Sequence, residues 1–151
     1  MNKTPTDFEA LRVPQLENIY LGVNHSVEEL QEKLAIEMGR SSYYDILPRN
    51  FNIIPEITKC SLDDLQRLEE LTTRRFNCYW AIQKKKAKKN GTLERYYAEY
   101  KFYDTRNRMN DEQINELFIR VEEYCHQRMT TQKIIECLIE APNFLEEVMC
   151  V

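Results

Sequence analysis

The sequence contains few of the residues that interrupt helices. Only three glycines and five prolines occur in 151 residues, and strong helix formers fill the stretches between them. We therefore predict an all-α fold, a single-domain helical bundle of five to seven helices with one long central helix. We expect one domain over residues 1–151, because this length suffices for one ordinary core, with residues 1–6 frayed.

The sequence also lacks any apolar run of the length that a bilayer requires and a basic-then-apolar leader after Met1. We expect neither a membrane span nor secretion, and an intracellular location, cytoplasmic or nuclear. Its five cysteines form no close pairs, and its two histidines are distant from each other, so we expect small buried or idle surface thiols in a reducing compartment and no metal site.

Motifs of catalysis are missing as well. The chain has no glycine-rich phosphate loop and no serine nucleophile elbow. The acidic pairs Asp63-Asp64 and Glu69-Glu70 occupy helix-start and solvated positions. We predict a protein without enzymatic activity, catalytic residues or cofactors.

The long central helix is predicted over residues 61–90. Ser61 precedes Asp64 by three residues, which is a variant of the capping box. The Ser61 hydroxyl can therefore accept a hydrogen bond from a backbone amide of the first turn, where amides have no partner within the helix. Asn90-Gly91 is typical of a helix end. One predicted apolar face follows the helical period: it comprises Leu62, Leu65, Leu68, Thr72, Phe76, Tyr79, Trp80 and Gln83.

Capping signals predict the other helices. Pro14 can open a short helix that ends at Gly22, after a turn or two between residues 7 and 13. Ser26 with Glu29 predicts a separate helix over 27–38 that ends at Gly39, and Asn110 with Gln113 predicts a helix over 111–128. Thr130 or Thr131 begins the next helix, Pro142 stops it, and a short helix follows.

Two segments leave alternatives open. Residues 93–103 follow the helix period at Leu93, Tyr96, Tyr97 and Tyr100, and we favour a helix, although the preceding Asn-Gly pair is also a hairpin signal. Residues 40–60 contain two prolines and many apolar side chains. We expect an ordered irregular connection whose apolar side chains insert between helices, with a binding loop as the alternative.

The net charge of −4 conceals a polarity along the chain. Between residues 74 and 108, eleven Lys or Arg and three acidic residues give a charge of +8, whereas the remainder carries −12. Tyrosines interleave with the cations. We take the following as the candidate binding residues: Arg74, Arg75, Lys84, Lys85, Lys86, Lys88, Lys89, Arg95, Tyr97, Lys101, Arg106 and Arg108.

This basic, aromatic-rich end suits an acidic partner. Our first hypothesis is a helical interaction protein that binds an acidic protein surface or itself. The alternative is a protein that binds single-stranded RNA or DNA, since cations attract phosphates and exposed rings stack on unpaired bases. Rings buried at core positions cannot stack, and no groove-reading motif is present.

The segment 120–126 suggests a third hypothesis. It reads Arg-Val-Glu-Glu-Tyr-Cys-His, which in a small helical domain resembles the signature of HEPN ribonucleases, whose Arg and His act on the RNA phosphodiester in a dimer cleft. The resemblance implies that Arg120 stabilises the phosphate and that His126 serves as acid or base. Val121 departs from the usual polar residue, and residues six apart lie about 120° apart on a straight helix.

Overall fold

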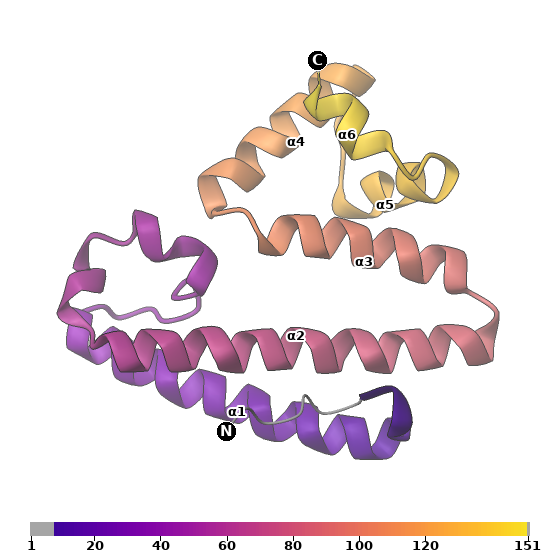
Figure 1. Cartoon of the computed structure of the whole chain (residues 1–151). Coiled ribbons are helices and arrows are strands. Elements are labelled where there is room, and N and C mark those ends of the chain that lie inside the picture. The colour runs from indigo at the N-terminus through magenta and orange to yellow at the C-terminus, as the bar shows by residue number, and fades with distance from the viewer. Residues whose placement is uncertain (1–7, 151) are drawn as a thin grey trace. The chain divides into compact units, whose positions relative to one another are not determined.

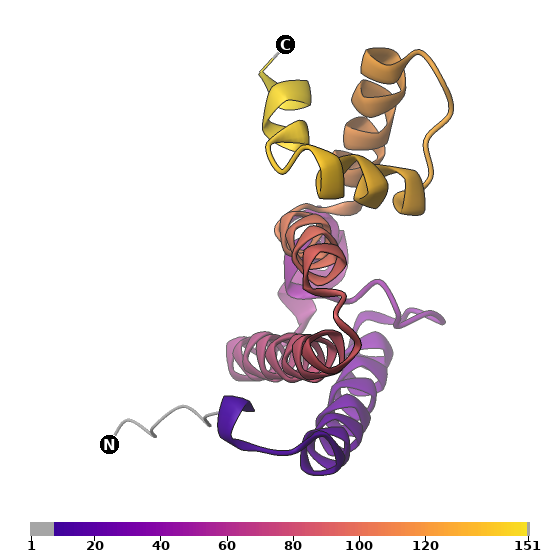
Figure 2. The same ribbon diagram turned by 90° about the vertical axis from the view of Figure 1, so that its right-hand side faces the viewer.

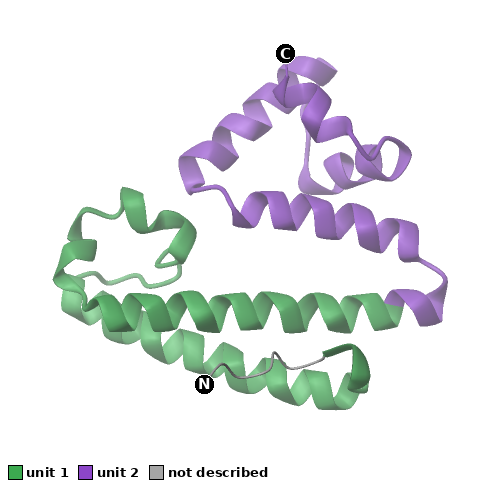
Figure 3. Cartoon of the chain, viewed as in Figure 1, with its two compact units in different colours: residues 1–86 green, residues 87–151 purple. Residues whose placement is uncertain are grey.

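The computed structural model describes residues 8–150 and shows helices without any strand in that range (Figure 1). The all-α prediction is confirmed, whereas the predicted fraying of residues 1–6 lies outside the described residues. The chain forms two compact units, residues 1–86 and 87–151 (Figure 3). Helix α2, Leu62–Asn90, begins in the first unit and ends in the second, and it is the long helix that the sequence predicts.

Unit 1 contains a short 3-10 helix η1, Phe8–Ala10, and the helix α1, Val13–Met38. The two separate helices predicted here are wrong, because α1 continues through Gly22 without a break. Ser26 caps nothing; its hydroxyl donates to the Gly22 carbonyl 3.1 Å away, one turn earlier in the same helix. Local signals predicted a boundary that tertiary packing overrides.

Gly39 ends α1, as predicted. Its φ of 71° is the left-handed conformation, and the Arg40 amide donates to the Ala35 carbonyl over 2.8 Å. With the bond from the Gly39 amide to Ile36 at 3.1 Å, this forms the Schellman pattern of helix ends.

The connection between α1 and α2 packs against the core of unit 1. It contains two 3-10 helices, η2 over Pro48–Ile53 and η3 over Pro55–Lys59. Ile46 and Ile54 are buried against α1, and the buried Gln31 amide donates to the Ile46 carbonyl over 2.9 Å. The apolar side chains do insert between helices.

Helices α1 and α2 lie side by side in unit 1 (Figures 1 and 2). The Ser61 hydroxyl accepts from the Asp64 amide at 3.2 Å, which confirms the predicted cap. The predicted apolar face of α2 is only partly correct: Leu62 is 82% exposed, whereas Cys78, outside that face, is fully buried. The Cys78 thiol donates to the Leu16 carbonyl over 3.2 Å.

Unit 2 contains α3, Leu93–Asn107, α4, Asp111–Cys125, α5, Thr131–Glu140, and α6, Phe144–Met149. Residues 93–103 are therefore helical. Asn110 and Thr130 cap α4 and α5 through bonds to backbone amides, although α4 ends three residues before the predicted Arg128. The core of this unit is centred on residues of all four helices: Phe102, Leu117, Val121, Ile134, Leu138 and Leu145.

Candidate interaction surface

Five lysines lie near the C-terminal end of α2, and we call them the lysine cluster: Lys84, Lys85, Lys86, Lys88 and Lys89. Gly91 adopts a φ of 71°, and the Thr92 amide donates to the Ala87 carbonyl at 2.9 Å, which ends the helix. Cations in the last turn of a helix lie at the negative end of its dipole. The helix dipole therefore stabilises the charged lysines even when no partner is bound.

Two of the five arginines of the candidate set, Arg74 and Arg75, lie within unit 1. Arg75 is half-buried and donates from Nη1 to the Asn24 Oδ1 atom of α1 at 3.0 Å. Burial lowers the pKa of its guanidinium from the usual value. The guanidinium carbon of Arg74 lies 5.5 Å from the centroid of the Phe8 ring, a cation–π contact. Both side chains hold unit 1 together.

The first two lysines of the cluster contact η1. Lys84 Nζ lies 3.5 Å from the Glu9 carboxylate, and Lys85 Nζ donates to the Glu9 backbone carbonyl at 2.7 Å. Nothing in the sequence links Glu9 to residues some 75 positions later. The contact exists because the chain folds so that η1 packs against the C-terminal half of α2.

Two of the four cations of α3 and its C-terminal flank pair with acidic side chains of α3 itself. Arg95 pairs with Glu99 at 2.8 Å, and Arg108 pairs with Asp104 at 3.4 Å, each one helical turn away. Both spacings are visible in the sequence.

Lys101 reaches α6, where it contacts the Glu146 carboxylate at 2.8 Å and the Pro142 carbonyl. The hydrogen bond from Lys101 holds the pKa of Glu146 below its usual value. Arg106 is half-buried in the last turn of α3. The eleven cations therefore do not form one continuous charged surface.

Three lysines of the lysine cluster are exposed to solvent and unpaired in the part of the chain that the structure describes. Lys86, Lys88 and Lys89 are exposed, and none forms an ion pair within residues 8–150. We call these three residues the lysine end. Tyr97, in the second turn of α3, is 55% exposed, and its ring packs edge-on against Tyr96 with centroids 5.1 Å apart.

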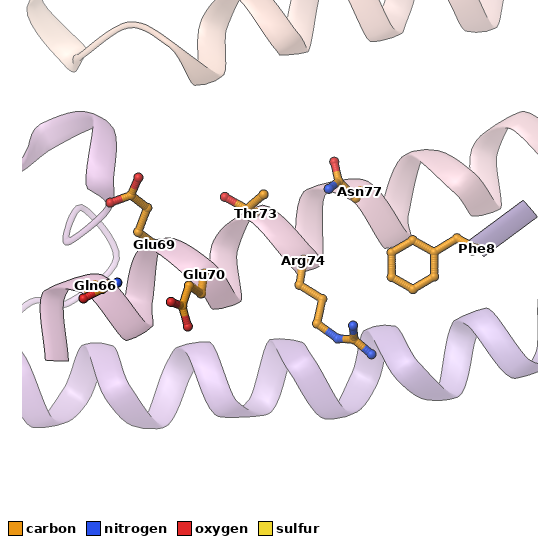
Figure 4. Close-up of a pocket in the computed structure, with 7 residues that line it drawn as sticks. All are labelled: Phe8, Gln66, Glu69, Glu70, Thr73, Arg74 and Asn77. Atoms are coloured by element: carbon orange, nitrogen blue, oxygen red, sulfur yellow. The ribbon is translucent and has the colours of Figure 1, made fainter. Parts of the chain in front are cut away.

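A separate hollow lies in unit 1 along α2 (Figure 4). Its volume is about 500 Å³, and Phe8 of η1 closes one end. The remaining lining comes from one face of α2 and is polar: Gln66, Glu69, Glu70, Thr73, Arg74 and Asn77. The sequence gives no signal of this hollow, because η1 forms its end.

The geometry separates the two residues that resemble the ribonuclease pair. Arg120 lies on α4 and pairs with Glu116 at 3.3 Å. His126 lies beyond the helix and is exposed, and its φ of 54° is left-handed. The histidine therefore does not continue the helix that carries the arginine.

Residues 8–150 contain neither a metal site nor a helix that could span a membrane. No three His, Cys, Asp or Glu side chains there gather closely enough to bind a metal ion. Within that range, no helix combines the length and the apolar composition that crossing a membrane requires.

The comparisons with known proteins give no relative. No family model matches the chain, and neither a curated protein nor a solved structure matches it.

Proposed function

We propose that this protein is a non-enzymatic helical interaction protein that binds an acidic protein surface through its lysine end. The observation that supports the proposal is the contrast among the cations. Most of them already contact carboxylates or carbonyls, whereas Lys86, Lys88 and Lys89 are exposed and unpaired within residues 8–150. Unpaired cations attract carboxylates without first breaking an internal ion pair.

An exposed ring in unit 2, the unit that contains Lys88 and Lys89, adds apolar contact area. Tyr97 presents more than half of its surface to solvent, and tyrosine is enriched in protein interfaces because its ring is apolar and its hydroxyl can hydrogen-bond. A partner surface with two or three carboxylates beside an apolar side chain would suit these residues.

Single-stranded nucleic acid suits this surface less well. Affinity for a phosphate backbone rises with the number of cations that neutralise phosphates. Arg95 and Arg108 each lie beside a carboxylate, which would repel a phosphate. Three lysines in one short segment would contact only a few phosphates.

The test uses two labelled probes, a glutamate-rich peptide and a single-stranded RNA, titrated at about 50 and 200 mM salt, where phosphate contacts weaken strongly. We expect saturable peptide binding that unlabelled RNA does not displace. Lys88→Glu with Lys89→Glu should abolish it. The matched control, Lys59→Glu with Lys133→Glu, changes the net charge equally at exposed lysines elsewhere and should bind as wild type does.

Two results would overturn the proposal. Tighter binding of RNA than of the peptide would favour the nucleic-acid alternative. Equal loss of peptide binding in the control pair would show that only the net charge matters. Exposed charges contribute little to folding, so all variants should melt near the wild-type temperature.

A further inference from the structure

Unit 1 carries an exposed acidic surface on α1. Glu28 and Glu32 lie one turn apart on this helix, and both are exposed. Neither carboxylate forms an ion pair in the part of the chain that the structure describes. Glu28 accepts from the neutral Asn24 amide at 3.3 Å, and the nearby guanidinium of Arg75 bonds to Asn24 as well. Both carboxylates are therefore open to a cation from another molecule.

Two aromatic rings lie beside these carboxylates. Tyr43, in the connection between α1 and α2, packs against the core of unit 1. Its ring centroid is 4.4 Å from that of Tyr44, and the two hydroxyl groups are 3.3 Å apart. This hydrogen bond, together with desolvation and the negative charges of Glu32 and Glu28, raises the pKa of Tyr43 to about 12. Because a charge shifts a pKa only over a short distance, both carboxylates lie near the Tyr43 hydroxyl.

The Tyr44 ring is the exposed part of this aromatic pair. Tyr44 is 72% exposed, and Tyr43 packs against one side of its ring. The face of an aromatic ring attracts a cation, and nearby carboxylates attract the same cation. We call Glu28, Glu32, Tyr43 and Tyr44 the acidic patch. Its chemistry suits the ammonium group of a lysine.

We propose that the acidic patch of one copy binds the lysine end of a second copy, head to tail. The proposal rests on the function proposed above and names the acidic partner as another molecule of this chain. Two carboxylates beside an exposed ring are the kind of surface that Lys86, Lys88 and Lys89 would bind. One chain therefore carries both halves of a contact with complementary charge.

The two surfaces are too far apart to meet within one chain. Helices α1 and α2 run antiparallel in unit 1 (Figure 1). Glu28 lies one turn to one side of the contact between Asn24 and Arg75, and Lys86 lies three turns to the other side. At 1.5 Å per residue, about 22 Å along α2 separates them, farther than a lysine side chain extends. The other lysines of the lysine end lie farther along the same helix, so the contact joins two copies.

The contact joins different surfaces of the two copies. It leaves a free acidic patch on one copy and a free lysine end on the other, so further copies add until a ring closes. In sedimentation of the full chain at about 50 mM salt, the mass should rise with concentration above the 18.2 kDa of one chain. At about 200 mM salt the association should weaken, because salt screens exposed charges.

Two neutral variants that each remove one half of the contact give the decisive test. Glu28→Gln with Glu32→Gln removes the charge of the acidic patch, and Lys88→Gln with Lys89→Gln removes most of the charge of the lysine end. Each variant alone should sediment as a monomer. Mixed in equal amounts, they should form a complex of twice the 18.2 kDa of one chain, because each supplies the half that the other lacks.

Matched controls remove the same charges elsewhere. Glu17→Gln with Glu123→Gln neutralises exposed carboxylates of α1 and α4, and Lys59→Gln with Lys133→Gln neutralises exposed lysines of η3 and α5. Both control variants should associate as the wild type does.

Three results would overturn the self-association: a monomeric wild type, association that survives in either test variant alone, or a mixture of the two variants that stays monomeric. The glutamate-rich peptide separates this failure from failure of the proposed function. A monomeric wild type that binds the peptide would mean that the lysine end has a different acidic partner. A monomeric wild type that does not bind the peptide would overturn both proposals.

Discussion

Single side chains connect α1 to α2 in unit 1. Lys33 Nζ donates to the Asp64 carboxylate at 2.9 Å, and Arg75 and Cys78 bond to groups of α1. The hydrogen bond from Lys33 lowers the pKa of Asp64, and the same bond raises the pKa of Lys33. Each charged form is therefore favoured in the folded protein.

These shifts give the pair a pH window. A lowered carboxyl pKa stabilises the fold above the unfolded value of about 4, and this stabilisation is lost as the pH falls through the folded pKa. A raised lysine pKa stabilises the fold below the unfolded value of about 10.4, and this is lost as the pH rises through the folded pKa. The pair thus acts across the neutral range.

We predict that Lys33→Met lowers the free energy of unfolding slightly at neutral pH and that the difference from wild type shrinks in acid. Urea titrations at several pH values measure this difference. Lys59→Met, at an exposed lysine of η3, should have almost no effect at any pH. A loss for Lys33→Met that does not change with pH would assign the effect to packing instead.

At the scale of elements, two glycines have opposite roles in α1: Gly22 lies inside the helix, whereas Gly39 ends it. Gly22 lies in the middle of the helix, and a Cβ built there would meet no atom within 4 Å. Gly39 adopts a φ of 71° at the helix end, where an L side chain is strained. The sequence predicts an end at both glycines, but only Gly39 forms one.

Gly22→Ala should therefore raise the free energy of unfolding by about 1 kcal/mol, since alanine favours a helix interior over glycine by this amount. Gly39→Ala should lower it by about 1–2 kcal/mol, the cost of a left-handed conformation. Urea unfolding of the two variants beside wild type measures both. Destabilisation by Gly22→Ala would contradict the continuous helix α1.

At the scale of the whole molecule, each unit has its own core. Leu68 is fully buried in unit 1, and Leu138 is buried in unit 2. The long helix α2 contains residues of both units, because it continues without a break across the boundary at residues 86 and 87. Unfolding of either unit would fray this helix, so our prediction remains one cooperative domain.

Leu138→Ala tests that cooperativity, because Trp80, in unit 1, is the single tryptophan. Removing a buried leucine side chain costs about 2–5 kcal/mol. We expect the melting curves from Trp80 fluorescence and from far-ultraviolet circular dichroism to shift together, as they should for Leu68→Ala. Separate transitions, with Trp80 unaffected by Leu138→Ala, would show two independently folding domains.

Local residue patterns alone determined much of the secondary structure. Hydrophobic periodicity and caps predicted α2, α4 and α5 and the helical state of residues 93–103, because these signals involve neighbours within one or two turns. The caps at Ser61, Asn110 and Thr130 involve donors three residues away. The general location of the basic segment was also readable from the sequence.

Only the tertiary structure decided which side chains are available on the surface. Arg75, Lys84 and Lys101 are candidate binding cations by sequence, yet each contacts a residue from a distant segment, namely Asn24, Glu9 and Glu146. The continuity of α1 and the burial of Cys78 likewise depend on what packs beside them. Contacts over long sequence separation leave no local pattern, so the fold had to be known before the lysine end could be identified.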